Sequence, residues 1–345
     1  MALRIIQVGL GGWGRNWAKD VISHNPNVEL VACVDMIESI RERAQQELDL
    51  PTNIFFPTLT EALATVECAA VVVTANLPGH VPVALEALHA GKHVLLEKPF
   101  APTLDEARQV IAAAEQQQRT LMISQNYRFY PAVRKVIELV RANTLGPVGT
   151  VNIDFRRYSN SAPREGHVHY TIWQPLLVDM SIHHFDLMRA VLGQEVSSIS
   201  CHTWNPVWSN FDEAPTGAAT ISFNRGAVVN YRGSWVSTGP QTSWGGEWHI
   251  ECAEGEIIWS SRDDPNPDYV LVRPLGSEQA EPLKLPDVAL RDRNGSLQAF
   301  VEAIGSGQQP ETTGRDNYNT LALMLAAVES ATHDGALTTP PQYAK

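Results

Sequence analysis

The order of apolar segments in residues 1–125 constrains the fold of this chain most. Short runs rich in β-branched residues alternate there with stretches of helical periodicity. The run Ala69-Ala70-Val71-Val72-Val73 is apolar throughout, which indicates a strand buried on both faces. Such alternation is typical of an α/β fold with a doubly wound parallel sheet. The predicted strands are Leu3–Val8, Val28–Val34, Ile54–Phe56, Ala69–Thr74, His93–Leu96 and Thr120–Ser124, and the predicted helices are Trp13–Ser23, Ile37–Glu47, Leu59–Ala64, Pro82–His89 and Leu104–Gln117.

The pattern changes after a predicted helix near Ala132–Ala142 and a Gly146-Pro147 turn. Strands with period-2 alternation then follow one another, which favours an α+β domain with a large, open, mostly antiparallel sheet. We therefore predict two domains, 1–125 and 126–345. The predicted strands of the second are Val151–Arg157, Ser197–Trp204, Ala218–Asn224, Ala227–Val236, Trp248–Glu251, Glu256–Trp259 and Tyr269–Val272, and its further helices are Val178–Val191, Ser296–Ile304 and Tyr318–Thr332.

Composition narrows the class of partner. The 345 residues carry a formal net charge of −12 without a basic stripe, so binding to a nucleic-acid backbone is not expected. No apolar stretch approaches the ~20 residues of a membrane helix, and no secretory signal precedes Gly9. The four scattered cysteines (Cys33, Cys68, Cys201 and Cys252) favour reduced thiols in a cytoplasmic protein. The expected partner is a small molecule.

A glycine-rich turn follows the first predicted strand. Gly9-Leu10-Gly11-Gly12-Trp13-Gly14 fits G-x-G-x-x-G and opens a predicted helix. Gly9 permits the tight turn, Gly11 lets a pyrophosphate approach the backbone, and Gly14 lets the helix pack on the strand. Asp35, at the end of the second strand, is placed to accept hydrogen bonds from both adenosine ribose hydroxyls. Neither Met36 nor Ile37 supplies an arginine for a 2′-phosphate, so the prediction is NAD rather than NADP.

Two further segments carry ionisable residues that suit chemistry. Glu97-Lys98-Pro99 follows the fifth strand, at the sheet edge where such folds bind ligands. Within Asp179–Asp186, a helix places Asp179 and His183 (i, i+4) on one face with Asp186 nearby. Ionisable groups on a largely apolar helix are costly unless they are paired or functional. The segment lacks H-E-x-x-H spacing, so no metal is predicted.

Taken in order along nearly the whole chain, these motifs resemble the glucose–fructose oxidoreductase/inositol dehydrogenase/rhizopine catabolism (Gfo/Idh/MocA) family. The resemblance also rests on Thr74-Ala75-Asn76, His80, Asn126-Tyr127-Arg128-Phe129, and Pro310-Glu311 with Gly314-Arg315-Asp316. It implies a Rossmann domain, a C-terminal domain that supplies dimer or tetramer contacts, and the catalytic residues Lys98, Asp179 and His183. The cofactor-binding residues that it implies are Gly9, Leu10, Gly11, Gly12, Trp13, Gly14, Asp35, Thr74, Asn76, His80, Glu97, Lys98 and Asn126. Many relatives carry glycines just before the position of Asp179, where this chain has Trp173-Gln174-Pro175-Leu176-Leu177.

A mechanism follows from these residue types. His183 is the expected general base for a substrate hydroxyl, because histidine titrates near neutrality. Lys98 is expected to hydrogen-bond the same oxygen, and either residue is able to carry the proton. Asp179 is expected to orient the substrate or His183, and Glu97 to support Lys98 or the nicotinamide ribose.

The expected substrate is a sugar, cyclitol or related polyol, because aromatic side chains stack on sugar faces. The substrate-binding residues that we expect are Lys98, Tyr127, Arg128, Arg156, Trp173, Asp179 and His183, with Tyr158 and Trp208 as further candidates. For Trp235, Trp248 and Trp259, on predicted strands, a place in a core or interface is favoured. His167 and His169 are expected to be solvated loop residues.

The sequence is compatible with three functions. The leading one is an NAD-dependent dehydrogenase, the second an NAD-dependent glycosidase that oxidises its sugar transiently, and the third a non-catalytic dinucleotide-binding regulator. The intact set Lys98, Asp179 and His183 argues against the third. The alternating strands of residues 126–345 also predict a broad apolar sheet face, buried in a homodimer or homotetramer.

Overall fold

A computed structural model describes residues 2–262 and 267–343, which divide into two compact units. Unit 1 comprises Met1–Asn126 together with Leu290–Tyr318, and unit 2 comprises Tyr127–Ala289 together with Asn319–Lys345. The division at Asn126 lies next to the predicted boundary. The return of Leu290–Tyr318 to unit 1 differs from a single cut, and side-chain contacts explain it: Ser296 Oγ donates to Ser124 Oγ (3.3 Å), and Asn25 Nδ2 donates to Gln298 Oε1 (3.3 Å).

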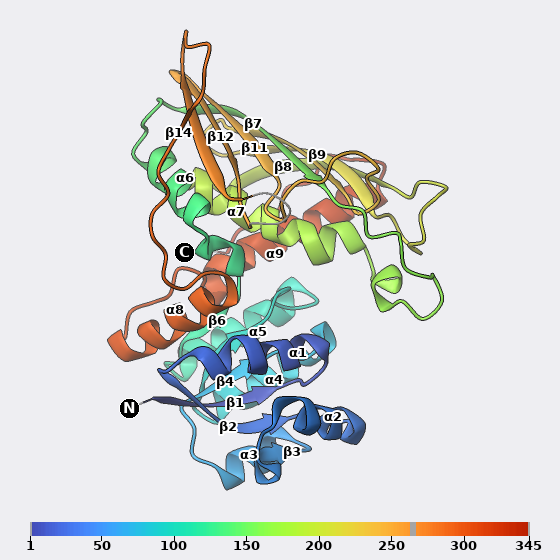
Figure 1. Ribbon diagram of the computed structural model, residues 1–345, viewed down its shortest axis with the longest axis vertical. Helices are drawn as coiled ribbons and strands as arrows, with labels where there is room; N and C mark the ends of the chain where they lie inside the picture. Colours follow the sequence, from blue (N-terminus) through green and yellow to red (C-terminus); the bar gives the residue numbers. More distant parts are fainter. Residues whose placement is uncertain (1, 263–266, 344–345) are drawn as a thin grey trace. The chain divides into compact units, whose positions relative to one another are not determined.

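Unit 1 is the predicted doubly wound parallel sheet (Figure 1). Its strand order is β3-β2-β1-β4-β5-β6, and every neighbouring pair is parallel. All four residues of β4 are buried, as its unbroken apolar run predicts. The strands are β1 (Leu3–Val8), β2 (Val28–Val34), β3 (Phe55–Phe56), β4 (Ala70–Val73), β5 (His93–Leu96) and β6 (Leu121–Ile123). The helices are α1 (Gly12–Asp20), α2 (Glu38–Leu48), α3 (Leu59–Thr65), α4 (Leu77–His89), α5 (Leu104–Gln116) and α8 (Asp292–Ser306), with short 3-10 turns at Ile22–His24 and Thr52–Ile54.

Unit 2 contains an eight-stranded sheet in the order β14-β13-β12-β11-β7-β10-β9-β8. Neighbouring strands are antiparallel except for the parallel pair β7 and β10. The strands are β7 (Val148–Arg156), β8 (Val196–Trp204), β9 (Thr216–Phe223), β10 (Val228–Ser234), β11 (Glu247–Cys252), β12 (Gly255–Ser260), β13 (Tyr269–Pro274) and β14 (Glu281–Pro282). The helical segments are η3 (Asn126–Phe129), α6 (Pro131–Arg141), η4 (Val168–Thr171), η5 (Pro175–Ser181), α7 (Ile182–Leu192) and α9 (Gly314–Thr332), which continues from unit 1.

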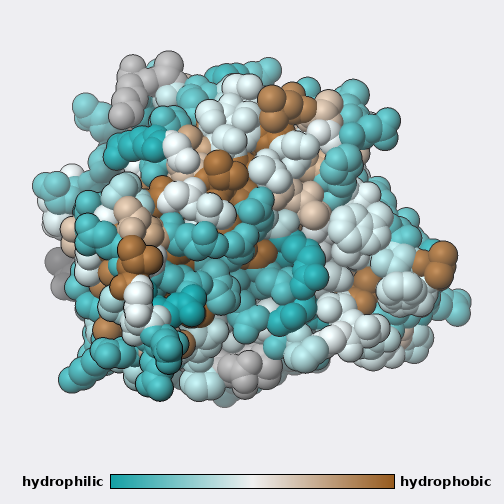
Figure 2. Space-filling view, turned by 90° about the horizontal axis from the view of Figure 1, so that it is seen from above, coloured by the Kyte–Doolittle hydropathy of each residue, from teal (hydrophilic) through white to brown (hydrophobic). Residues whose placement is uncertain are grey.

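The helices α6 and α7 cover one face of this sheet in Figure 1. The strand residues that face them are apolar and buried, for example Val151, Ile153 and Phe155 of β7. The alternate residues form a polar opposite face, where Arg232 donates two hydrogen bonds to Asp154 (2.8 and 2.6 Å). In Figure 2, hydrophilic residues are interspersed with smaller brown groups. The prediction of a broad apolar sheet face is therefore wrong, because the helices already cover the apolar residues.

The described residues contain no helix long and apolar enough to cross a membrane.

Candidate active site

The glycine turn of unit 1 has the backbone geometry that its sequence predicts. Gly9 adopts φ +97°, and a Cβ there would lie 2.4 Å from the backbone nitrogen of Ala75. A Cβ on Gly14 would lie 1.9 Å from the carbonyl oxygen of Gly9, so helix α1 meets β1 only through a glycine. At Gly11 and Gly12 a Cβ would meet nothing within 4 Å. Gly9 and Gly14 are thus required by the close packing of the backbone, whereas Gly11 and Gly12 leave open space for a ligand.

Asp35 follows β2 and is tied to the glycine turn. Its Oδ2 accepts a hydrogen bond from the Leu10 backbone N–H (2.9 Å), and its Oδ1 accepts one from the Ile37 N–H (3.0 Å). Each carboxylate oxygen retains a lone pair for a ribose hydroxyl. Sequence reasoning missed Arg41, which lies one turn into α2 and donates from Nη1 to the Asp35 carbonyl oxygen (2.7 Å). The sequence offered one signal for this contact: Arg41 lies one turn into the predicted helix that begins just after Asp35.

Thr74 and His80 hold the neighbouring loops through backbone contacts. Thr74 donates from Oγ1 to the Gly9 carbonyl oxygen (2.7 Å), and so joins the end of β4 to the glycine turn. The ring nitrogens of His80 lie 2.7 Å from the Pro99 oxygen and 3.1 Å from the Ala75 oxygen. Burial lowers the pKa of His80. Thr74 thus holds the glycine turn, and His80 holds the loops that follow β4 and β5.

Asn76 and Asn126, the other two polar residues implied for the cofactor, lie at element boundaries. Asn76 is the N-cap of α4, and its side chain makes no capping hydrogen bond. Asn126 is 5% exposed and hydrogen-bonds through Nδ2 to Asp292 of α8.

Glu97 and Lys98 directly follow β5, at the carboxyl edge of the parallel sheet. Glu97 is only 6% exposed; its Oε1 accepts from Trp17 Nε1 (2.7 Å) and its Oε2 from the Lys98 backbone N–H (3.1 Å). Burial raises the pKa of Glu97, against the lowering effects of the Lys98 charge and these hydrogen bonds. Glu97 therefore joins Trp17 of α1 to the start of the Lys98 segment.

Asp179 lies on η5, a π-helical turn, and α7 begins only at Ile182. The prediction of one α-helix through Asp179 and His183 is wrong at this point, because the chain enters from Gln174 in a left-handed conformation (φ +46°) and Pro175 opens the wider turn. The Asp179 side chain is 37% exposed, and its Oδ2 lies 3.7 Å from His169 Nε2. His169 also packs edge-on against Trp235, with ring centroids 4.8 Å apart. His169 is therefore a site neighbour that the polar loop sequence concealed.

His183 is 6% exposed and stacks on Tyr127. The ring centroids are 4.0 Å apart and the planes differ by 5°. The Arg262 guanidinium carbon lies 4.5 Å from the Tyr127 centroid, and its Nη1 donates to the Tyr127 hydroxyl (2.5 Å). Two groups this close cannot share one ring face, so Tyr127 separates the imidazole from the guanidinium. The stack fixes the plane of the His183 ring.

The remaining ionisable groups of α7 are buried and paired. Asp186 accepts two hydrogen bonds from Arg128, from Nε (2.6 Å) and Nη2 (2.7 Å), and a third from Thr320 Oγ1 (3.1 Å). His184 Nε2 donates to the Trp244 carbonyl oxygen (3.0 Å), which leaves Nδ1 to accept from the Tyr231 hydroxyl (3.0 Å). Burial lowers the pKa of His184 to about 4, so this ring is neutral at pH 7. We interpret Arg128, Asp186 and His184 as structural.

The other aromatic residues considered for the substrate site differ in the exposed fraction of their side chains. Trp173 and Trp208 are 51% and 57% exposed, and Tyr158 is 43% exposed. Trp235, Trp248 and Trp259 are 3% exposed or less, which confirms their expected place in the core. Arg156 is engaged on the polar sheet face, where its Nη2 lies 2.9 Å from Glu247 Oε2.

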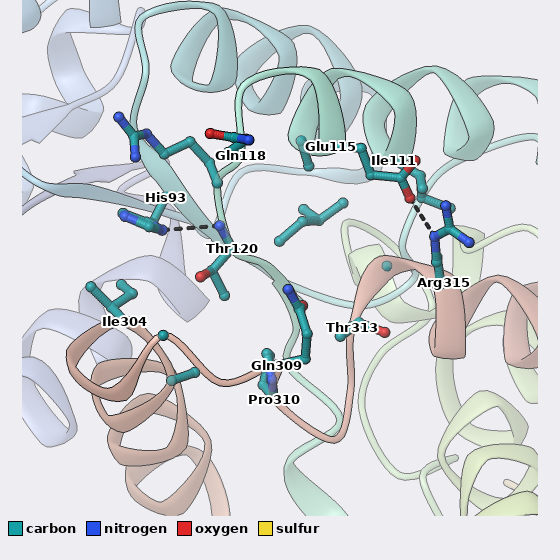
Figure 3. A pocket seen from close by; sticks show the side chains of 16 residues that line it. His93, Ile111, Glu115, Gln118, Thr120, Ile304, Gln309, Pro310, Thr313 and Arg315 are labelled. Atoms are coloured by element: carbon teal, nitrogen blue, oxygen red, sulfur yellow. Dashed lines mark hydrogen bonds and ion pairs between the residues drawn. The ribbon is translucent and has the colours of Figure 1, made fainter.

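A separate cavity of about 840 Å³ lies at the opposite, amino edge of the unit 1 sheet (Figure 3). Its lining includes His93 at the start of β5, Leu121 at the start of β6, and Arg315, which pairs with Glu115. No predicted site residue lines this cavity. The described residues also contain no group of three or more His, Cys, Asp or Glu side chains placed to hold a metal ion.

The residues present fit a bound dinucleotide. The open positions Gly11 and Gly12 leave room above the start of α1, whose first N–H groups have no intrahelical acceptor. Asp35 completes the ribose end. Lys98 lies in unit 1, whereas Asp179 and His183 lie in unit 2.

Comparison with known proteins matches both parts of the chain to family models. Residues 3–125 match the family described as "Oxidoreductase family, NAD-binding Rossmann fold", and residues 133–258 match "GFO/IDH/MocA C-terminal domain". The chain is 26% identical over 340 residues to scyllo-inositol 2-dehydrogenase (NAD(+)) of Bacillus subtilis, covering 95% of this chain and 94% of that protein.

Solved structures share the fold. An oxidoreductase from Agrobacterium radiobacter in complex with NAD+, L-tartaric acid and magnesium has a TM-score of 0.85 at 17% identity, covering 98% of both chains. Aldose-aldose oxidoreductase from Caulobacter crescentus, complexed with glycerol, has a TM-score of 0.84 at 20% identity, covering 98% of this chain and 100% of that one.

Proposed function

Because the chain belongs to the Gfo/Idh/MocA family of NAD-binding oxidoreductases, we propose that it oxidises a secondary hydroxyl of a sugar, cyclitol or related polyol. NAD is the cofactor, and when bound it supplies a nicotinamide ring that accepts a hydride. The names of relatives support the substrate class: inositol, D-apiose and 1,5-anhydro-D-fructose all carry several hydroxyl groups. Exposed Trp173 and Trp208 are the aromatic surfaces that we assign to sugar stacking.

The proposed reaction moves one proton and one hydride from the substrate. His183 accepts the hydroxyl proton as the carbon–hydrogen bond breaks and its electron pair leaves with the hydride, which makes the hydroxyl a carbonyl. Lys98 donates a hydrogen bond to the same oxygen and stabilises its alkoxide character. Asp179 orients the substrate or His183 and is in turn approached by His169.

The observation that carries this proposal is the parallel stack of His183 on Tyr127. A general base must present one ring nitrogen to the substrate in a fixed direction, and a stack at 4.0 Å restricts rotation of the imidazole. The neighbouring His184 cannot replace it, because both of its ring nitrogens are bonded within unit 2.

A substrate screen tests the function. Purified protein is incubated with NAD and a panel of monosaccharides, cyclitols and glycosides, and NADH is followed by its absorbance. We expect steady NADH production with at least one polyol or sugar. Release of an aglycone without net NADH would instead identify the glycosidase alternative, and no turnover of any kind by protein that binds NAD would contradict an enzymatic role.

Variants of the catalytic set test the assignment of roles. Lys98→Ala and His183→Ala are each expected to lower kcat by a factor of about 10²–10⁴ with little change in NAD affinity. The double variant is expected to be scarcely slower than either single variant, because both groups act on one oxygen. A kcat for Lys98→Ala close to that of the wild type would contradict the mechanism.

We further propose that the chain works in the cytoplasm as a homodimer or homotetramer through the polar face of the unit 2 sheet. That face carries a shallow cavity of about 370 Å³ bordered by Asp154, Arg232 and His249. Charged groups at an interface set register and make association sensitive to salt. Light scattering at micromolar concentration tests the proposal: a monomer at low salt would contradict it.

A further inference from the structure

Arg293 brings a positive charge from the far end of the sequence to the glycine turn. It lies in the first turn of α8, within the segment that returns to unit 1. Its guanidinium carbon is 4.4 Å from the centroid of the Trp13 ring and 5.9 Å from that of Trp17. Both distances are within the ~6 Å of a cation–π contact. Trp13 is itself part of the turn and is 44% exposed, and Arg293 lies over its ring.

The guanidinium is incompletely bonded. Its Nε and Nη1 atoms are buried, yet neither has a hydrogen-bond partner among residues 2–262 and 267–343. Arginine stays protonated, so these N–H groups cannot be neutralised by losing a proton. Burial of a charged donor without an acceptor is costly. An acceptor that binds here would remove that cost.

The surroundings favour an anion as this acceptor. The first turn of α1 contains no acidic residue, and its free N–H groups give the helix start a partial positive charge. The nearby acid Glu97 already accepts from Trp17 and from the Lys98 N–H. Gly11 and Gly12, which directly precede Trp13 in the turn, have open space around them.

We propose that Arg293 binds the pyrophosphate of NAD, with Trp13 holding the guanidinium in plane. The inference rests on NAD binding and is independent of the substrate and of the catalytic roles proposed above. Arg293 then supplies charge-assisted hydrogen bonds from α8, opposite the backbone N–H groups of the turn. Half of the pyrophosphate site would come from sequence almost three hundred residues beyond the glycine motif.

Ligand binding without turnover tests this proposal. ADP-ribose, which keeps the pyrophosphate and lacks nicotinamide, is titrated into wild type, Arg293→Gln and Arg293→Lys by calorimetry; adenosine serves as the ligand without phosphate. A lost charge-assisted bond of ~1.5–3 kcal/mol predicts an ADP-ribose Kd about 10- to 100-fold higher in Arg293→Gln. Arg293→Lys should retain part of the affinity, and adenosine binding should be unchanged.

Arg119→Gln is the matched control, since Arg119 is an exposed arginine of the same unit that bonds Gly91 at the other edge of the sheet. It should bind ADP-ribose like the wild type. Weaker binding of NADH but not of ADP-ribose in Arg293→Gln would overturn the proposal and assign Arg293 to the nicotinamide end. Unchanged binding of both would also overturn it. If Arg293→Gln does not fold, unaltered ADP-ribose affinity in Trp13→Leu and Arg293→Lys together would count against the proposed contact.

Discussion

The buried ion pair between Arg128 and Asp186 predicts a large, specific loss of stability when one partner is removed. The two side chains are 6% and 1% exposed, and two hydrogen bonds of 2.6 and 2.7 Å join them. In Arg128→Met, Asp186 keeps the hydrogen bond from Thr320 (3.1 Å) but loses both hydrogen bonds from Arg128. An uncompensated buried charge of this kind costs about 3–5 kcal/mol. At ~2–4 °C per kcal/mol, Tm should fall by roughly 6–20 °C.

The assay is chemical and thermal unfolding of four proteins: wild type, Arg128→Met, Asp186→Leu and the double variant. The double variant should recover much of the loss, because no unpaired charge remains in the core. Arg232→Met is the control, since Arg232 makes the same bidentate contact with Asp154 but is 57% exposed. That exposed pair should contribute ~1 kcal/mol or less.

The same variant also distinguishes a structural role of Arg128 from a role in substrate binding. Arg128 was expected from sequence to contact the substrate. If Arg128→Met unfolds like the wild type while KM for a confirmed substrate rises, the structural role is wrong and the substrate role is correct.

Two further predictions concern the cofactor and pH. Asp35→Ser should weaken NAD binding and relax discrimination against NADP, because it removes the ribose acceptors and leaves Arg41 as the nearby charge; a wild type preferring NADP tenfold would contradict the assignment. The pKa of His184 is lowered to about 4, so below ~6.5 the unfolded chain binds a proton that the folded one does not. Stability should therefore fall by about 2 kcal/mol from pH 7 to 5 through this group, and urea unfolding of His184→Gln should lack that part of the slope.

Local patterns predicted the nucleotide-binding half well. Close backbone contacts require glycine at positions 9 and 14, and the uninterrupted apolar β4 could belong only to a covered sheet. The π-helical turn at Asp179 was not predictable, because apolar periodicity does not distinguish it from an α-helix.

Partners distant in sequence were missed for a related reason. The contacts of Arg293 with Trp13 and of Arg262 with Tyr127 arise only when the chain folds back. The exposed face of the unit 2 sheet was predicted to be apolar, and it is polar. Alternation shows that the two faces of a sheet differ, but it does not show that helices of the same unit cover the apolar face.

The return of Leu290–Tyr318 to unit 1 has a consequence for folding during synthesis. Asn126 is synthesised about 190 residues before Tyr318. At ~5–20 residues per second, the delay between the two is roughly 10–40 s. Through that interval the nascent parallel sheet lacks α8, and Ser124 lacks its partner Ser296. Unit 2 has almost all of its chain before unit 1 is complete. The amino-terminal unit is thus completed only near the end of synthesis, and a nascent-chain protease assay should find it cleavable until residues near 318 emerge.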